Sequence, residues 1–406
     1  MSAGQTMMSA SCLRQMAAQM ETPIYYPWYW DLEQEVRAML RTVLGTEGDV
    51  LLLAGSATFG IEAGIRSTIR PGGKVVVING GVFGQVLVDI VRAVGCVPVE
   101  VPVPYGTAPD MDRVARALDQ QGVEALAAVH AETSTGTAFP IDRLGALARE
   151  KGVLFLVDAV SSVGGMEFHM DAWGVDLCFT SPQKCLSGPQ GIAIVAVSER
   201  AWQAVRRRER PVDSICLDLE VWKRYHDEKV DAMNRAWRQG AREPRPHGRA
   251  AHEPSPSGPL VRGLHGALLD LLKEGLPSVL GRHRVCARAV REAVRAVGLR
   301  TVAAEEVAAP VVTVFYLPEG VYEKDFRAAM LSRWGIAIGN GEIGDDNVRV
   351  GTMGTAAQPQ YVLATVTALE DTLRRFGHRF SAGAGVQAAL DVLAAEGSVR
   401  WHGSAV

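Results

Sequence analysis

The sequence has few of the features that mark membrane proteins, metal sites and nucleic-acid-binding proteins. Its 406 residues contain no apolar run of about 18 residues, so no segment is expected to span a membrane. The six cysteines form no CxxC pair, so neither a zinc site nor a disulfide framework is indicated. The formal net charge of −3 shows no basic excess, so neither nucleic acid nor a membrane surface is an expected partner.

The first 15 residues also lack the pattern of a secretory signal, which is a basic stretch followed by an apolar one. A reducing cytoplasm is therefore the expected location. Hydrophobic residues make up 48% of the chain and charged residues 21%, as in ordinary globular proteins. A chain of this length is too long for one simple core and suits two unequal domains.

Short apolar runs alternate with helical patterns in the first half of the chain. The expected strands are 50–54, 74–79, 97–103, 125–130, 153–157, 177–180 and 192–197. The expected helices are 60–69, 85–94, 111–120 and 141–151. This alternation predicts an α/β fold with a mostly parallel sheet and helices on both faces. Ligands of such sheets bind at the carboxyl ends of the strands.

Residues 204–259 interrupt this pattern, and the part from Gln239 to Pro259, rich in Arg, Pro, Gly and His, predicts a loop or flexible insert. Helical patterns resume over 261–274 and 277–297. Strands are expected at 311–316 and 348–351, and helices at 322–334 and 360–376. We therefore expect an N-terminal segment (1–20), a large domain (21–259, with the insert at 239–253) and a small C-terminal α+β domain (260–406).

Small and aromatic residues follow the first two expected strands. Gly55-Ser56-Ala57-Thr58 opens a helix, where backbone N–H groups and the helix dipole can hold an anion, although by itself a plain Gly-Ser turn is the better explanation of this segment. Phe83 lies between glycines in Asn79-Gly80-Gly81-Val82-Phe83-Gly84. Such an aromatic can stack on a planar ring, or it can be a buried phenylalanine in a turn.

Ionisable residues follow three later strands. His130-Ala131-Glu132-Thr133-Ser134-Thr135-Gly136 crowds polar groups at a strand end, as a capped turn also would. Asp158 ends a buried run and needs a partner there, unless it only caps the next helix. Lys184 ends Ser181-Pro182-Gln183-Lys184 and could bind an aldehyde cofactor, although loop lysines are usually solvated.

The combination is more specific than any of its parts. An anion cradle, a stacking aromatic, a carboxylate and a lysine all lie at the ends of strands in one sheet. Pyridoxal 5′-phosphate (PLP) requires this set, because its phosphate needs the cradle, its pyridine nitrogen needs an acid and its aldehyde needs a lysine.

These residues resemble the class V, fold-type I, PLP-dependent aminotransferases. The resemblance is strongest over Asp158-Ala159-Val160-Ser161-Ser162-Val163-Gly164-Gly165 and Thr180-Ser181-Pro182-Gln183-Lys184, with a step of 26 positions from the acid to the lysine. It extends through 197–202 and 353–359. The sequence is similar to the alanine–glyoxylate and serine–glyoxylate enzymes and looks most like pyridoxamine–pyruvate aminotransferase. The resemblance implies an aminotransferase that moves an amino group from an amino donor to a small 2-oxo acid such as pyruvate or glyoxylate.

The resemblance also implies roles for individual residues. Lys184 would bind PLP as a Schiff base and shuttle the proton, and Asp158 would pair with the pyridine nitrogen. Phe83 would stack on the ring, and Thr133 would bond near the ring hydroxyl. The remaining implied contacts are to the phosphate from Ser56, Ala57 and Gln183, and to the substrate from Gly4 and Arg349, whose planar fork suits a carboxylate.

In this family a Thr-Pro of the second subunit of a homodimer reaches the phosphate. Ser255-Pro256 stands at that place here, so Ser255 is expected to bind the cofactor across a dimer interface. The insert 239–253 has no counterpart in the family pattern. The run Tyr25-Tyr26-Pro27-Trp28-Tyr29-Trp30 predicts dimer packing or a pocket for a larger donor.

Two further departures concern the reaction. The pyridoxamine-consuming enzyme has an acidic residue where Ser56 stands, which favours a conventional aminotransferase here. Thr352 stands where related enzymes often have His, so the substrate is expected to differ. Pyridoxamine–pyruvate transamination and a PLP lyase or desulfurase on the same scaffold remain open, as does a non-catalytic relative, although Lys184 and Asp158 argue against the last.

Overall fold

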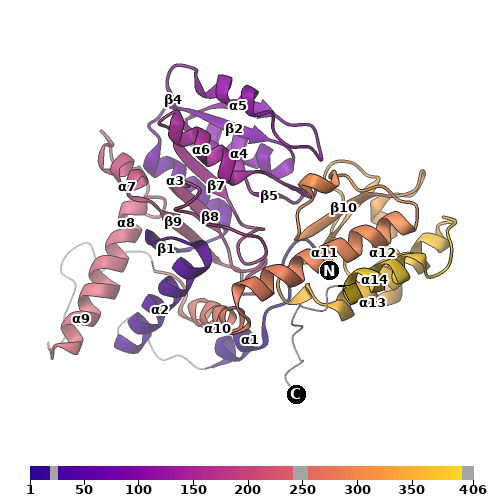
Figure 1. The fold of residues 1–406 in the computed structure, drawn as a ribbon. Coiled ribbons are helices and arrows are strands. Elements are labelled where there is room, and N and C mark those ends of the chain that lie inside the picture. Colours follow the sequence, from indigo (N-terminus) through magenta and orange to yellow (C-terminus); the bar gives the residue numbers. More distant parts are fainter. Residues whose placement is uncertain (19–25, 241–254, 396–406) are drawn as a thin grey trace.

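A seven-stranded mixed sheet forms the centre of the molecule (Figure 1). The computed structural model describes residues 1–18, 26–240 and 255–395. The strand order is β1-β9-β8-β7-β4-β2-β3, and only β9 runs antiparallel to its neighbours. The strands are β1 (Asp49–Ala54), β2 (Lys74–Asn79), β3 (Val97–Pro102), β4 (Val123–Val129), β7 (Leu154–Asp158), β8 (Leu177–Thr180) and β9 (Ile192–Val197). The predicted α/β fold with a mostly parallel sheet is confirmed.

Apart from the edge strand β3, the sheet is buried on both faces because its strands are apolar at nearly every position. Successive side chains of a strand point to opposite faces. In β1, Val50 and Leu52 join one hydrophobic core, whereas Leu51 and Leu53 join the other. Continuous apolar runs of this kind are typical of parallel sheets covered by helices on both sides.

Different sets of helices cover the two faces. The first core receives side chains from α2 (Pro27–Leu44), α5 (Met111–Leu118), α6 (Ile141–Glu150) and α10 (Gly258–Glu274). The second receives side chains from α3 (Ala57–Thr68), α4 (Val82–Ala93), α7 (Glu199–Arg206) and α8 (Leu219–Arg224). The helices α3 and α4 directly follow β1 and β2, so their N-termini lie at the carboxyl edge of the sheet.

Residues 204–259, which interrupt the alternation of strands and helices, are helical over much of their described length. They contain α8, the π-helix η2 (Tyr225–Ala232) and α9 (Met233–Arg238). These helices were not predicted, because the Arg-rich composition concealed apolar residues such as Trp222 and Val230, which are fully buried. Residues 241–254, most of the predicted insert, lie outside the described residues. The aromatic run is also divided, since Tyr29 and Trp30 fill the first core while Tyr26 and Trp28 are exposed.

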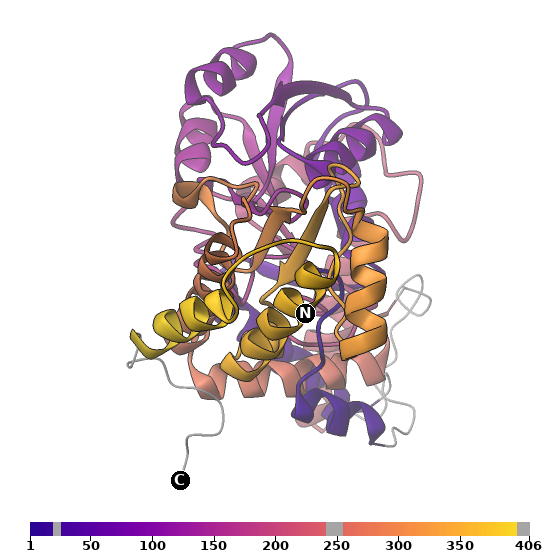
Figure 2. The same cartoon turned by 90° about the vertical axis from the view of Figure 1, so that its right-hand side faces the viewer.

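The C-terminal part is built around a two-stranded antiparallel pair and several helices. Its elements are α11 (Leu276–Ala296), β10 (Val312–Tyr316), α12 (Glu323–Trp334), β11 (Asn347–Gly351), α13 (Pro359–Arg375) and α14 (Ala384–Ala395). They share a third core, which runs from Val285 to Val392. Figure 2 shows these orange and yellow helices in front of the two short orange strands. How the chain divides into domains stays a prediction.

The N-terminal segment crosses to this C-terminal part. The amino group of Met1 donates to Ala337 O (2.8 Å), and Gly351 N donates to Met1 O (3.0 Å). The helix α1 (Ala10–Ala17) then packs against α10. Residues 1–9 therefore run past the carboxyl edge of the sheet between the two parts of the chain.

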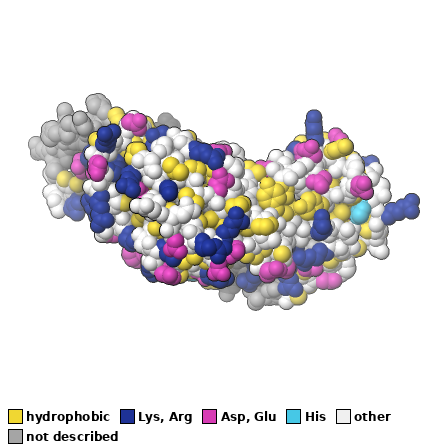
Figure 3. Space-filling view, turned by 90° about the horizontal axis from the view of Figure 1, so that it is seen from above, with side chains coloured by type: hydrophobic (Ala, Val, Ile, Leu, Met, Phe, Trp, Pro, Cys, Tyr) yellow, Lys and Arg dark blue, Asp and Glu magenta, His cyan; other side chains and the backbone are white. Residues whose placement is uncertain are grey.

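The surface agrees with the charge balance of the sequence. Seen from above, basic and acidic side chains are interspersed on the face that Figure 3 shows. Within the described ranges, no helix is long and apolar enough to cross a membrane.

Candidate active site

The lysine and the acid predicted from the sequence follow neighbouring strands. Asp158 is the last residue of β7, and β8 pairs with β7 in parallel, with Asp158 opposite Phe179. Lys184 follows β8 after a turn of three residues. Parallel neighbours end at the same edge of a sheet, which explains why residues 26 positions apart face one region.

The Lys184 side chain is partly buried under the N-terminal segment. Its Nζ donates to Ala3 O at 2.6 Å, and Thr6 Oγ1 donates to Lys184 O at 2.8 Å. Burial, with the nearby charge of Arg349, lowers the pKa of Lys184 below its usual value. A lowered pKa increases the fraction of neutral amine, which is the form that attacks an aldehyde.

Asp158 is a buried carboxylate that meets no cation directly. Its side chain is 9% exposed, and Oδ1 accepts a hydrogen bond from Val160 N at 3.0 Å. Burial raises the pKa of Asp158 to about 6, and the charge of Lys184 opposes that rise. Within the described residues, no ion pair of 4 Å or less joins Asp158 to Lys184. Each acts on the other's charge across intervening space.

A second buried acid, Glu132, fixes the start of α4. Its carboxylate accepts hydrogen bonds from Gly84 N (2.9 Å) and Ser134 N (3.1 Å). A Cβ atom at Gly81 would lie 2.5 Å from Glu132 Cδ, so only glycine allows this approach. Burial raises the pKa of Glu132. The predicted stacking residue Phe83 thus lies in the first turn of a helix, and not in a loop as expected.

The hydroxyl of Thr133 has no partner. Thr133 is 1% exposed, and its Oγ1 is buried without a hydrogen bond in the part of the chain that the structure describes. An unsatisfied buried hydroxyl is costly, and such groups are commonly satisfied by a ligand or water. Thr133 O, on the opposite side of the residue, accepts a hydrogen bond from Arg349 Nη1 at 3.5 Å.

The three residues predicted to hold the phosphate lie on two adjoining loops. Ser56 is the N-cap of α3 without a side-chain capping bond, so its hydroxyl is left for another partner. Gly55 N donates to Gly191 O (3.0 Å), which joins the loop before α3 to the loop between β8 and β9. Gln183 lies in the latter loop and accepts a hydrogen bond from Ser181 Oγ. Ala57 N belongs to the first turn of α3, where N–H groups lack intrahelical acceptors.

Arg349 lies in β11 and reaches the sheet edge from the C-terminal part. It is 5% exposed. Its Nε donates to Asn340 O (2.9 Å), and its Nη2 donates to Asn340 Oδ1 (3.2 Å) and to Glu342 Oε1 (2.6 Å). The charges of Glu342 and Glu132 act on Arg349, and that of Arg349 acts on Lys184. The arginine therefore faces the same region as the lysine.

The structure brings most, but not all, of the predicted site residues together. Lys184, Asp158, Thr133 and Arg349 are connected by hydrogen bonds or by electrostatic interaction, and Gly4 adjoins the Ala3 carbonyl that binds Lys184. Ser255 makes no described contact with them within this chain. Its predicted place in the site of a second subunit stays a prediction.

Three contributors were not predicted from the sequence. Ala3 supplies its backbone carbonyl, which no residue-type pattern reveals. Glu132 was noted only as part of a polar run, although the adjacent Gly80-Gly81 hinted at close packing. Glu342 was missed altogether, and its signal was an acid between two glycines of the loop, seven residues before Arg349.

The arrangement can hold a planar, phosphorylated aldehyde. The orphaned Thr133 hydroxyl, the unpaired Asp158 carboxylate and the depressed pKa of Lys184 all suit such a ligand, and the first turn of α3 suits its phosphate. Among the described residues, no group of three or more His, Cys, Asp or Glu side chains could hold a metal ion.

Comparison with known proteins identifies this architecture as that of fold-type I aminotransferases. Residues 30–215 match the family model "Aminotransferase class-V". The chain is 32% identical over 376 residues to pyridoxamine–pyruvate transaminase of Mesorhizobium japonicum, covering 92% of this chain and 91% of that protein. It is 31% identical over 371 residues to an uncharacterized aminotransferase of Methanocaldococcus jannaschii, covering 91% and 90%.

A solved structure shows the same similarity in three dimensions. The crystal structure of ureidoglycine–glyoxylate aminotransferase from Bacillus subtilis aligns with a TM-score of 0.88 at 29% identity and covers 97% of each chain. The chain belongs to the class-V aminotransferase family. It is an aminotransferase, the family implies PLP as cofactor, and its relatives use glyoxylate or pyruvate as acceptors.

Proposed function

We propose that this enzyme transfers an amino group from an amino donor to a small 2-oxo acid, such as pyruvate or glyoxylate, at the site formed by Lys184, Asp158 and Arg349. The observation that carries the proposal is the separation of Lys184 and Asp158. Asp158 is buried and Lys184 is partly buried at one sheet edge, they influence each other's charge, and no hydrogen bond or ion pair joins them among the described residues. A single ring between them would satisfy both.

Each residue has a chemical task in this proposal. PLP, when bound, supplies an electron sink that stabilises negative charge at the donor carbon. Lys184 holds the aldehyde end and, once released by the donor, carries the proton to and from that carbon. Asp158 stays ionised beside the ring nitrogen and keeps it protonated. Phe83 packs on the ring, and Thr133 donates its free hydroxyl near the ring oxygen.

The phosphate and the substrate are held at opposite ends of the site. Ser56, Ala57 and Gln183 offer a hydroxyl, a helix N–H and an amide for the phosphate. Arg349 offers its guanidinium to the acceptor carboxylate, and Gly4 lies in the segment that covers Lys184. Ser255 of a second subunit in a homodimer would add another hydroxyl to the phosphate.

Serine at position 56 favours an amino donor other than free pyridoxamine. Pyridoxamine has no phosphate, so a site that binds it gains from an acidic residue where a phosphate would otherwise lie. Ser56 is uncharged and caps a helix whose positive end attracts anions. The pocket therefore suits a phosphorylated cofactor that stays bound through the cycle.

The test is a donor screen with the purified, PLP-loaded protein. Donors are offered with pyruvate or glyoxylate, and the new amino acid is measured by mass spectrometry. The visible absorbance of the bound cofactor should change on adding a productive donor alone. Lys184→Ala should lose turnover by at least about 10³-fold, the usual scale for a proton-transfer group. Turnover by Lys184→Ala near the wild-type rate would disprove the proposal.

A further inference from the structure

The substrate arginine already binds a carboxylate from its own chain. Arg349 Nη2 lies 2.6 Å from Glu342 Oε1, and the arginine side chain is 6% exposed. Bonds of this length between a guanidinium and a carboxylate are among the stronger hydrogen bonds in proteins. The Glu342 carboxylate therefore stands where the carboxylate of a substrate would bind Arg349.

The other donors of Arg349 leave little room for a second carboxylate. Nε and one Nη2 hydrogen are directed to Asn340, and one Nη1 hydrogen is directed to Thr133 O. Of the five N–H groups of an arginine, only one on Nη1 then lacks an acceptor among the described residues. A substrate carboxylate can bind two N–H groups in parallel only if Glu342 moves away.

Glu342 is poised for such a move. Its side chain is 20% exposed, and Oε2 is buried with no hydrogen-bond partner within the described ranges. The contact to Arg349 is thus its one polar anchor in that part of the chain. It lies in a loop that contains Gly339, Gly341 and Gly344, and not in a helix or strand.

We propose that Glu342 determines donor specificity by exchanging with the substrate carboxylate on Arg349. When the donor is a primary amine without a carboxylate beside its amino group, Glu342 stays on Arg349 and keeps this buried cation paired. When the 2-oxo acid enters, its carboxylate displaces Glu342. This inference rests on the proposed function and names its donor class: amines without an α-carboxylate.

The physical reason is the cost of an unpaired buried charge. An amine donor brings no carboxylate, so a site with only Arg349 would bury an uncompensated guanidinium. Glu342 pairs with Arg349 when an amine is bound and so removes that penalty. A substrate carboxylate, in contrast, must compete with Glu342 for Arg349. The exchange is balanced: the amine carbon gives its amino group and one hydrogen to the 2-oxo carbon and takes its oxygen from one water, while the oxo oxygen of the acceptor leaves as another water. An aldehyde or ketone and an amino acid result.

The first experiment measures binding without turnover. Propanoate, which has the carboxylate of pyruvate but no oxo group, is titrated into the PLP-loaded enzyme by calorimetry. Glu342→Gln and Glu342→Ala should bind propanoate at least about tenfold more tightly than the wild type, the usual scale of a charged hydrogen bond. Asp345→Asn is the matched control, because it removes one negative charge from an exposed position of the same loop. It should change the affinity by less than about twofold.

The second experiment compares a matched donor pair, L-phenylalanine and 2-phenylethylamine, with pyruvate as acceptor. The wild type should use the amine at least as well as the amino acid by kcat/KM. In Glu342→Gln the ratio should shift toward the amino acid by about tenfold or more, and the KM for pyruvate should fall. Asp345→Asn should keep the wild-type ratio.

The outcomes separate the two proposals. Equal propanoate affinity in the wild type and both Glu342 variants would overturn the role of Glu342, whatever the activity. So would an amino acid preference in the wild type that Glu342→Gln leaves unchanged. If the loaded enzyme transaminates no donor at all, the proposed function fails, while tighter propanoate binding by the Glu342 variants would still establish the exchange on Arg349.

Discussion

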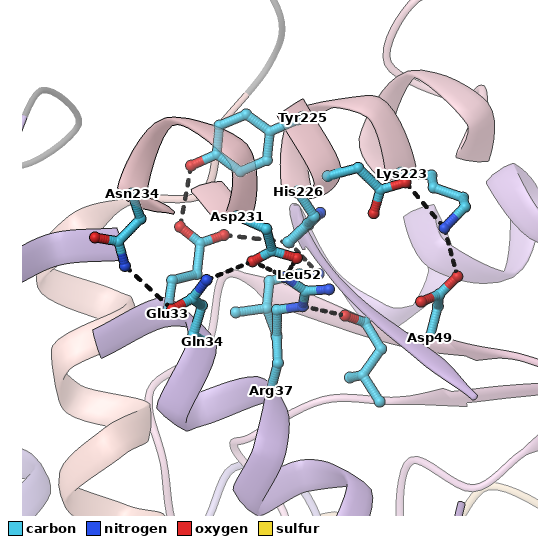
Figure 4. Close-up of polar contacts among 12 residues, drawn as sticks. Glu33, Gln34, Arg37, Asp49, Leu52, Lys223, Tyr225, His226, Asp231 and Asn234 are labelled. Atoms are coloured by element: carbon cyan, nitrogen blue, oxygen red, sulfur yellow. Dashed lines mark hydrogen bonds and ion pairs between the residues drawn. The ribbon is translucent and has the colours of Figure 1, made fainter. Parts of the chain in front are cut away.

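Two buried polar clusters in this chain differ in whether their polar side chains bind one another. In the helix cluster, formed by Glu33, Arg37, Tyr225, His226 and Asp231 between α2 and η2, polar side chains contact one another directly (Figure 4). Glu33 Oε2 accepts from Tyr225 OH at 3.0 Å, and Glu33 Oε1 lies 3.1 Å from His226 Nε2. In the sheet-edge cluster of Thr133, Asp158 and Lys184, they do not.

The neighbouring contacts extend this contrast. In the helix cluster, Arg37 Nη1 lies 3.2 Å from Asp231 Oδ1, and its Nε donates to Val50 O at 3.1 Å. These bonds fasten α2 and η2 to β1. At the sheet edge, the side-chain hydrogen bonds among the described residues join Lys184 to a backbone carbonyl and Asp158 to a backbone N–H. Buried charges that pair with each other stabilise a fold, whereas charges that face one space unpaired indicate a ligand.

The largest effect expected from breaking the sheet-edge cluster is on catalysis. Asp158→Asn removes the charge that would pair with the ring nitrogen, and losing one member of a buried charge pair costs about 3–5 kcal/mol. We therefore expect kcat/KM to fall by roughly 10²-fold or more. Steady-state kinetics with saturating PLP measure it, with unfolding curves as the control for folding. A fall of less than tenfold would mean that Asp158 does not face the ring.

A substitution in the helix cluster should lower stability and leave catalysis nearly unchanged. His226→Leu takes the acceptor from Leu52 N and the ring nitrogen from beside Glu33, so the free energy of unfolding should drop by about 1–3 kcal/mol. Urea unfolding monitored by tryptophan fluorescence measures the drop. The kcat of the folded fraction should stay within about twofold of the wild type, since the cluster lies away from the sheet edge. An unchanged unfolding midpoint would refute the structural role.

The contrast between these clusters was partly visible in the sequence. Asp158 and Lys184 could be predicted because each ends a strand-like run, and parallel strands bring such ends together. The strand bounds of β2, β8 and β9 were also predicted as the structure has them, since uninterrupted apolar runs end at polar or glycine residues.

The rest depends on contacts between distant segments. Helix α2 was not predicted, because its buried face includes Glu33 and Arg37, which break the apolar periodicity. They are buried only because η2 supplies His226 and Asp231 from about 190 residues further along the chain. Glu342 was missed for a similar reason, since its role depends on its contact with Arg349, which the loop brings close to it.

The pH dependence of the unfolding free energy of the cofactor-free protein tests whether Asp158 is a buried carboxyl without a cationic partner. The folded-state pKa of Asp158 is about 6, raised from 3.8 by burial. A carboxyl with a raised folded pKa stabilises the fold below its unfolded pKa and loses that contribution as pH rises toward the folded value. Between pH 4 and 6.5, the wild type should therefore lose up to about 3 kcal/mol relative to Asp158→Asn. Urea unfolding of both cofactor-free proteins tests this, and a wild type that gains stability over that range contradicts it.

The smallest and most discriminating effect is expected at Thr133, whose hydroxyl is buried without a partner. Thr133→Val keeps the shape and removes an unsatisfied polar group, so the cofactor-free protein should be unchanged or gain up to about 1 kcal/mol of unfolding free energy. The same change removes a hydrogen bond to PLP, so the cofactor should bind roughly fivefold more weakly. Urea unfolding and PLP titration by absorbance measure the two. A more stable cofactor-free protein together with weaker PLP binding is expected only if the Thr133 hydroxyl binds the cofactor. Destabilisation of the cofactor-free protein by Thr133→Val would place Thr133 with the helix cluster, as a residue that holds the fold.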